Sequence, residues 1–366
     1  MALPSVRESK DSSRLLKDSA RSKIISQTES LVKLSAHVWD LCCIRMRKNA
    51  RGFAMRGRAV RGDKMEQHAG FRAEGILPAR GYSMAELRSA AVTGRILEGR
   101  ALLCDEGCNL TVDLGGAVGF MPREECALGV AEGRVRDIAI LTRVGRQVCC
   151  CVTGFDGERP LLSRRAVQQR VQEEFISRLC PGDVIDCVVT RTAAFGAFVD
   201  VGCGLPSLIP IDNISVSRIA HPSDRLREGM SLRAVVRSLE EDTGRLHLTH
   251  KELLGTWEQN AALFAPGQTV PGIIRSVESY GVFVELMPNL TGLAEWQDGL
   301  SVGETAVVYI KSMQKERMKI KLLIADHFPT RTPPAPLRYF TEASHISRWR
   351  YSPEGCERVV ETVFDG

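Results

Sequence analysis

Two short stretches of the chain place aromatic side chains where they could stack on the bases of a nucleic acid. FGAFV begins at Phe195, and YGVFV begins at Tyr280, 85 residues further along. The glycine after each first ring favours a tight turn or a bulge, which would bring Phe195 and Phe198 onto one face of a sheet. Exposed rings suit single-stranded nucleic acid, because every base has a π-face. The alternative is that Phe198 and Phe283 fill a core, as buried phenylalanines commonly do.

The two stretches lie at equivalent places of a repeat that starts near residue 85. Gly182 matches Gly267 at the same separation of 85, whereas Gly229 matches Gly303 at a separation of 74, so the second unit has a longer excursion, NISVSRIAHPSDRLREG. A fainter copy over 92–165 has LLCDEGCNLTV where the aromatic stretch should stand. A period of this kind predicts several copies of one small structural unit.

Each unit is predicted to form about five short strands, because runs rich in Val, Ile and Leu alternate with Gly, Pro, Asn and Asp. Five antiparallel strands in roughly 70 residues suit a small closed barrel, which leaves no exposed edge. We therefore expect a mainly β protein with three tandem five-stranded barrels, helical linkers at 166–179 and 251–264, and little burial between barrels. The expected divisions are a basic extension at 1–83, barrels at 85–166, 180–252 and 265–326, and a tail at 327–366.

Charge is distributed unevenly along the chain. The net charge is +5, yet residues 1–83 are rich in Arg and Lys while residues 84–366 carry more Asp and Glu than Lys and Arg. Two interpretations of residues 1–83 stay open. They are an unfolded tail that contacts RNA phosphates, with one helix near 21–45, or a segment upstream of a true start at Met84, where regular patterning begins.

The composition also excludes several classes of protein. No stretch reaches the roughly 20 apolar residues of a membrane span, and the N-terminus lacks a secretory signal pattern. The 12 cysteines include no C-x-x-C pair, so we interpret them as reduced, small apolar residues. Sequence signatures of nucleotide hydrolysis, zinc proteolysis and acyl transfer are missing, as is an acidic cluster for metal-assisted cleavage. We expect a cytoplasmic protein that is not an enzyme, with no catalytic residue, metal, cofactor or small-molecule substrate.

The second unit closely resembles the RNA-binding repeat of bacterial ribosomal protein S1, an OB-fold barrel. The resemblance lies in PGDVIDCVV, FGAFVDVG, LPSLIPIDNIS, RIAHPSDRLREGM and EEDTGRLHLTHKEL, followed by Trp257. In that family two aromatic residues, a histidine, an acidic residue and an arginine form the binding face. The resemblance implies that Phe195, Phe198, Glu241 and Arg245 fill four of these places. Pro210 stands at the histidine position, and His221 or His247 is the candidate to lie nearby.

The third unit matches the family at Tyr280 and Phe283, has Ala294 at the histidine position, and adds a possible third ring at Trp296. Basic residues gather on its last two strands, either as a track for phosphates or as a solvated strand face; they are Lys311, Lys315, Arg317, Lys319 and Lys321. The first unit lacks the aromatic pair. Degenerate units of this family commonly contact protein or the ribosome.

The resemblance covers roughly 85–326 and implies a function. We expect a protein that holds single-stranded RNA, mRNA in particular, on or near the small ribosomal subunit. The alternative is an RNA-binding adaptor or regulator in RNA turnover that is not bound to ribosomes. The tail, with adjacent Trp349, Arg350 and Tyr351, resembles the end of short members from clostridial bacteria, and its role is not implied.

Overall fold

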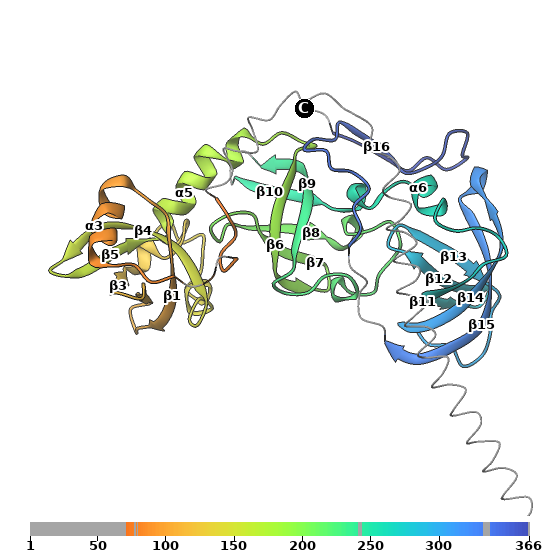
Figure 1. Cartoon of the computed structure of the whole chain (residues 1–366), viewed down its shortest axis with the longest axis horizontal. Coiled ribbons are helices and arrows are strands. Elements are labelled where there is room, and N and C mark those ends of the chain that lie inside the picture. The colour runs from red at the N-terminus through yellow and green to blue at the C-terminus, as the bar shows by residue number, and fades with distance from the viewer. Residues whose placement is uncertain (1–70, 77, 79, 241–243, 332–336, 365–366) are drawn as a thin grey trace, which may run out of the picture. The chain divides into compact units, whose positions relative to one another are not determined.

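The computed structural model describes residues 71–76, 78, 80–240, 244–331 and 337–364, so the helix expected near 21–45 lies outside the described part. Strands β1 to β15 form three closed five-stranded barrels in chain order (Figure 1). The predicted fold class is confirmed. Within the described ranges, no helix is both long and apolar enough to cross a membrane.

All three barrels have the same strand order. The first strand pairs with the second and the fourth, and the third strand pairs in parallel with the fifth. The first barrel consists of β1 (Leu97–Cys104), β2 (Leu110–Asp113), β3 (Val118–Met121), β4 (Gln147–Asp156) and β5 (Arg159–Ser163). The second consists of β6 (Val184–Ala193), β7 (Gly196–Asp200), β8 (Pro206–Pro210), β9 (Ser231–Glu240) and β10 (Arg245–Thr249). The third consists of β11 (Thr269–Glu278), β12 (Gly281–Met287), β13 (Leu290–Ala294), β14 (Glu304–Gln314) and β15 (Lys319–Arg331).

Alternation along the strands separates a core face from an outer face. On β6, Ile185, Cys187 and Val189 are buried while the residues between them are partly or fully exposed. This period of two follows from the pleat of a strand. Each barrel has its own apolar core of such inward residues. The side chains between them are therefore available on the outer surface.

Short helices lie before, between and within the barrels. Both predicted linkers are helical, but the second is two separate pieces because Gly255 at φ 84° interrupts it. The linkers contain α5 (Arg165–Glu174) with η4 (Ile176–Arg178), and η7 (Lys251–Leu254) with α6 (Trp257–Ala261). The other helices of the described ranges are α3 (Met84–Thr93), η3 (Arg123–Glu125), α4 (Ile138–Leu141), η5 (Ile211–Asn213), η6 (Pro222–Asp224) and η8 (Lys315–Arg317).

The first and second barrels meet around a buried arginine. Arg164, 4% exposed, donates from Nε and Nη2 to the Glu74 carboxylate at 2.6 and 3.0 Å. The Glu74 backbone N–H in turn donates to Asp200 of β7 at 2.8 Å. Burial, reinforced by the nearby Glu74 charge, raises the pKa of Asp200 to about 6. Glu74 belongs to the segment before Met84, so the folded part includes residues that the sequence assigned to the basic extension.

The second and third barrels meet around another buried arginine. Arg225, in the excursion of the second barrel, forms a bidentate ion pair with Glu285 of β12, and both side chains are only about 5% exposed. Burial alone would raise the pKa of Glu285, but the guanidinium groups of Arg225 and Arg275 lower it. Because Arg225 belongs to the second barrel and Glu285 to the third, their buried ion pair means that the two barrels are in contact there. The expectation of little burial between barrels is therefore wrong here.

The described tail, residues 337–364, packs against both of these barrels. The Ile346 N–H donates to the carbonyl of Gly182 at the entry to the second barrel, at 2.8 Å. Trp349 and Tyr351 join the core of the third barrel, and the Tyr351 hydroxyl donates to the carbonyl of Asn289. Two short strands, β16 (Arg348–Arg350) and β17 (Glu361–Val363), pair within the tail. The tail is thus an integral part of the fold.

Candidate nucleic-acid interface

A cross-strand row of side chains lies on the outer surface of the second barrel. Phe198 on β7 is in register with Arg191 on β6 and with Leu208 on β8, and Leu208 is in register with His247 on β10. None of the four side chains is buried. The Arg191 guanidinium lies over the Phe198 ring at 5.8 Å from its centroid. The row therefore offers a cation, a ring, an aliphatic surface and an imidazole side by side.

Phe195 extends this row at the tip of the β6–β7 hairpin. It lies in the two-residue turn before Gly196, is 57% exposed, and its ring meets that of Phe198 edge to face at a centroid distance of 5.7 Å. Of the two expected features, a tight turn precedes Gly196, whereas the irregularity of this hairpin lies between Val189 and Arg191 and not at the glycine. A Cβ at Gly196 would lie 2.5 Å from the carbonyl oxygen of Ile209, so glycine lets β8 approach. Both rings face one side because Phe195 belongs to the turn.

The histidine position is filled by a different strand from the one the resemblance implied. Pro210 pairs with Gly196 and brings no donor. His221 accepts the Ser223 N–H as the N-cap of η6. His247 lies in the row, with Nε2 at 2.7 Å from the Glu240 carboxylate. Of the two candidates, His247 is the one that the fold brings to the aromatic face.

The two other residues predicted to contact RNA in this barrel are Arg245 and Glu241. Arg245 is exposed and lies two residues before His247 on β10, hence on the same face of the strand. Glu241 lies outside the described residues. Glu240, its neighbour, is in register with Arg245, so an acidic and a basic side chain do border the row.

The third barrel repeats the row at equivalent positions. Phe283 on β12 is in register with Ser276 on β11 and with Leu293 on β13, and Leu293 is in register with Lys321 on β15. Tyr280, 68% exposed in the β11–β12 turn, meets the Phe283 ring edge to face at 6.2 Å. A lysine thus stands where the second barrel has its histidine. A serine stands where the second barrel has Arg191.

The remaining predicted residues of this barrel divide into two groups. Trp296 is 53% exposed, beyond the buried Ala294 at the end of β13. Lys311 and Lys315 form ion pairs with Glu295 and Glu258. Lys319 and Lys321 are exposed on β15, and no ion pair to either is found among the described residues. Lys319 and Lys321, like the exposed Arg317 of η8, therefore offer charge that is unpaired among the described residues.

The first barrel presents a different surface at the same place. The equivalent row consists of Leu103, Thr111, Phe120 and Leu161, so threonine stands where the other barrels have phenylalanine. Leu103 is 58% exposed, and Arg159 covers the Phe120 ring at 4.7 Å. Phe120 was not predicted as a surface ring. The similarity of GFMP at 119–122 to SLIP at 207–210 does, however, make Phe120 equivalent to Leu208. This face is mainly aliphatic.

Among the described residues, cysteines and potential metal ligands do not assemble into a second site. Each of the ten described cysteines is a free thiol, and six of the ten lie in the apolar cores. Burial raises the pKa of the Cys126 thiol to about 12, so it stays protonated at neutral pH. Cys42 and Cys43 lie outside the described residues. No cluster of three potential metal ligands occurs within the part of the chain that the structure describes.

Comparison with known proteins agrees with this geometry. Residues 179–251 match the family model of the S1 RNA binding domain. Small ribosomal subunit protein bS1 homolog of Bacillus subtilis (strain 168) is 37% identical over 143 residues, which are 38% of this chain and 37% of the relative. The bS1 protein of Leuconostoc lactis is 34% identical over 50% of this chain and 43% of its own. The bS1 homolog of Bacillus cereus is 31% identical over 58% and 56%.

The chain spans between 37% and 56% of the length of these three relatives. The matched family model covers the whole second barrel, including Phe195, Phe198 and His247. The third barrel repeats that barrel's strand order and its aromatic row. The match therefore identifies an S1 RNA binding domain at residues 179–251, and the chain is similar to bS1 proteins over part of their length.

Proposed function

We propose that this chain is a non-catalytic protein of the bacterial cytoplasm that binds single-stranded RNA, mRNA in particular, at the small ribosomal subunit. The observation that carries the proposal is the repeated outer row. Phe198 and Phe283 occupy equivalent places, each with a more exposed ring at the hairpin tip and an aliphatic neighbour. Each stacked base on such rings contributes roughly 1–3 kcal/mol.

Single strands fit these surfaces better than duplexes do. Stacking on Phe195 or Tyr280 requires an unstacked base, which a duplex does not offer. Lysine and arginine beside the rings suit the phosphates that follow each base. The rows contain few free cations, so stacking is the larger contribution and the affinity depends only modestly on salt.

The small subunit enters the proposal through the relatives, which are described as small ribosomal subunit proteins. The aliphatic face of the first barrel is consistent with a protein partner, because Leu103 and its neighbour Leu102 are both about half exposed. Aromatic rows on the second and third barrels, with an apolar face on the first, suit a protein that links mRNA to a large assembly.

One experiment separates the two parts of the proposal. The protein is titrated with an unstructured labelled RNA and with the same RNA annealed to its complement, and is then sedimented with purified small subunits. We expect the single strand to bind much more tightly than the duplex and the protein to sediment with the subunits. Equal affinity for both RNAs would refute the single-strand site. Tight RNA binding without sedimentation would instead support the adaptor role.

A further inference from the structure

The excursion of the second barrel is attached to the outer face of the third. We call residues 215–225 the docking loop. Arg225 at its end donates from Nη1 and Nη2 to the two oxygens of Glu285, each at 2.6 Å. Arg275 of β11 donates to the same carboxylate at 2.7 Å, and Asp224 lies 3.6 Å from Arg275. The Glu285 carboxylate thus binds one arginine from each barrel.

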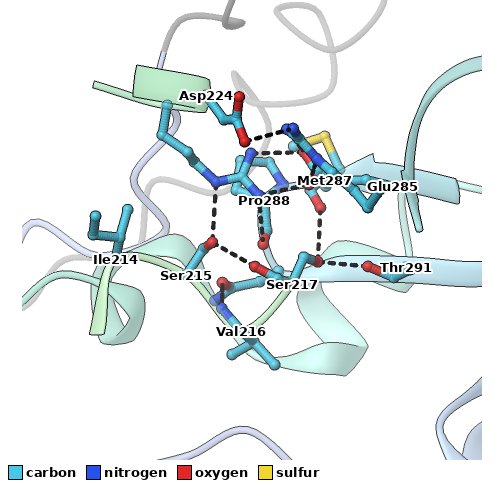
Figure 2. A network of polar contacts seen from close by, with 12 residues as sticks. Ile214, Ser215, Val216, Ser217, Asp224, Glu285, Met287, Pro288 and Thr291 are labelled. Carbon is cyan, nitrogen blue, oxygen red and sulfur yellow. Dashed lines mark hydrogen bonds and ion pairs between the residues drawn. The ribbon is translucent and has the colours of Figure 1, made fainter. Parts of the chain in front are cut away.

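The other end of the docking loop is held by hydrogen bonds to the β12–β13 hairpin. Figure 2 shows the Ser217 hydroxyl between Thr291, which donates to it at 2.7 Å, and the carbonyl of Met287. The Ser217 N–H donates to the carbonyl of Pro288, and the Val216 N–H donates to the Asn289 side chain at 2.9 Å. Both ends of the loop are therefore fixed to the third barrel.

This attachment lies next to the aromatic row. Glu285 is two residues beyond Phe283 on β12, and its cross-strand partner Thr291 is two residues before Leu293 on β13. Residues two apart on a strand share a face and are roughly 7 Å apart. The docking loop therefore borders the ring surface of the third barrel on the side away from Tyr280.

The third barrel lacks a cation at the place where the second has one. Arg191 lies over Phe198, whereas the equivalent β11 residue is Ser276. The docking loop carries an exposed arginine directly after its anchor, Arg218, and none of the described residues forms a hydrogen bond or ion pair with it. Arg218 is one residue beyond Ser217, whose hydroxyl binds Thr291, two residues before Leu293 of the row.

We propose that Arg218 of the second barrel completes the RNA site of the third barrel, where it contacts the phosphate next to a base stacked on Phe283. This inference rests on the proposed function and adds that the site is shared between two barrels. Arg225 and Ser217 are positioning residues that hold Arg218 beside the rings. A single strand then runs from Tyr280 across Phe283 to the docking loop.

The test is a double-mutant cycle between Arg218 and Tyr280, measured by RNA titration over a salt series. The parent protein carries Phe195→Ala and Phe198→Ala, so that binding reports the third barrel. We expect Arg218→Ala to weaken binding severalfold and to reduce the salt slope by about 0.7, the value for one phosphate contact on a single strand. The loss should be much smaller when Tyr280 is already alanine. Arg227→Ala, which removes another exposed arginine just beyond the loop, is the matched control.

The outcomes distinguish this inference from the proposed function. Equal effects of Arg218→Ala and Arg227→Ala, or effects of Arg218→Ala and Tyr280→Ala that simply add, would overturn the shared site while RNA binding itself persists. Absence of RNA binding by the unaltered protein would overturn the proposed function. Arg225→Met provides a second test, because releasing the loop should remove the Arg218 effect. Thermal unfolding of each variant verifies that the barrels remain folded.

Discussion

Asp200 and Glu285 occupy equivalent positions on the second strands of two successive barrels, yet their surroundings shift their carboxyl pKa values in opposite directions. Asp200 is buried beside the negative charge of Glu74, and its pKa rises to about 6. Glu285 is equally buried but lies between two guanidinium groups, which lower its pKa. The two junctions between barrels therefore respond differently to acid.

Asp200 should make the stability of the protein increase as the pH falls from 7 to 5. Its folded pKa of about 6 exceeds the ordinary 3.8, so the folded state binds the proton more tightly and gains stability as the pH falls through 6. Glu285 contributes no change in this pH window. Its pKa is lowered from the ordinary 4.5, so the stability that it gives the folded state is lost only below pH 4.5. Thermal unfolding of Asp200→Asn should lack the increase. Asp212→Asn, at an exposed site, should retain it; equal profiles for the two variants would contradict the assignment.

Replacing a ring at a hairpin tip should weaken RNA binding without unfolding the barrel. Phe195→Ala or Tyr280→Ala should cost roughly 1–3 kcal/mol of RNA affinity, the usual loss per stacked base. Folding should hardly change, because both side chains are more than half exposed. Leu103→Ala removes a similarly exposed apolar side chain from the first barrel and serves as the control. A fall in melting temperature by Phe195→Ala, without selective loss of RNA binding, would falsify the stacking role.

Lys321 should contribute a phosphate contact that Lys315 does not. Lys321→Gln should lower affinity for all RNA sequences alike and reduce the salt slope by about 0.7. Lys315→Gln is the matched control, since that ammonium is paired with Glu258. Titrations at several salt concentrations provide the measurement. If RNA binding by the two variants has the same salt slope, Lys321 is only part of a solvated face of β15.

Removing the segment before Met84 should destabilise the junction of the first two barrels. A protein that begins at Met84 lacks Glu74 and leaves the buried Arg164 guanidinium without its carboxylate. Loss of one partner of a buried ion pair costs about 3–5 kcal/mol. Urea unfolding of this shortened protein, beside one that begins at Met65 and retains Glu74, measures the difference. Identical stability would show that the ion pair is dispensable.

The tail should contribute strongly to the stability of the third barrel. Trp349, 7% exposed, is part of that barrel's core, so Trp349→Ala should cost roughly 3–5 kcal/mol. Val363→Ala in β17 changes an exposed tail residue and should cost little. Denaturant unfolding of both variants tests this expectation. Comparable, small losses would mean that the barrel folds without the tail.

The sequence predicted the barrels and the rings because the repeat carries that information. Phe198 matches Phe283, and the change in separation from 85 to 74 marks the shorter excursion of the third unit, so residue types alone align the equivalent strands. Phe195 and Tyr280, in the turns, are also more exposed than Phe198 and Phe283 within the strands.

Other features depend on contacts between distant segments and could not be predicted in this way. His247 joins the row through the parallel pairing of β8 with β10, a register that neither segment specifies alone. Arg225 resembles any loop arginine until the third barrel supplies Glu285. Glu74 lies in a segment whose composition suggested no fold. Side-chain periodicity reports local faces, whereas these partners are set by tertiary packing.

The tail is the last part of the described fold to be synthesised. His345 binds Asp183 at the entry to the second barrel, 162 residues earlier in the chain. A growing chain emerges from its N-terminal end, so both aromatic rows are made before the tail that contacts their barrels. Until residues near 345–364 emerge, the second and third barrels lack this connection. A nascent chain therefore exposes both aromatic rows when the docking loop joins the two barrels but the tail does not yet.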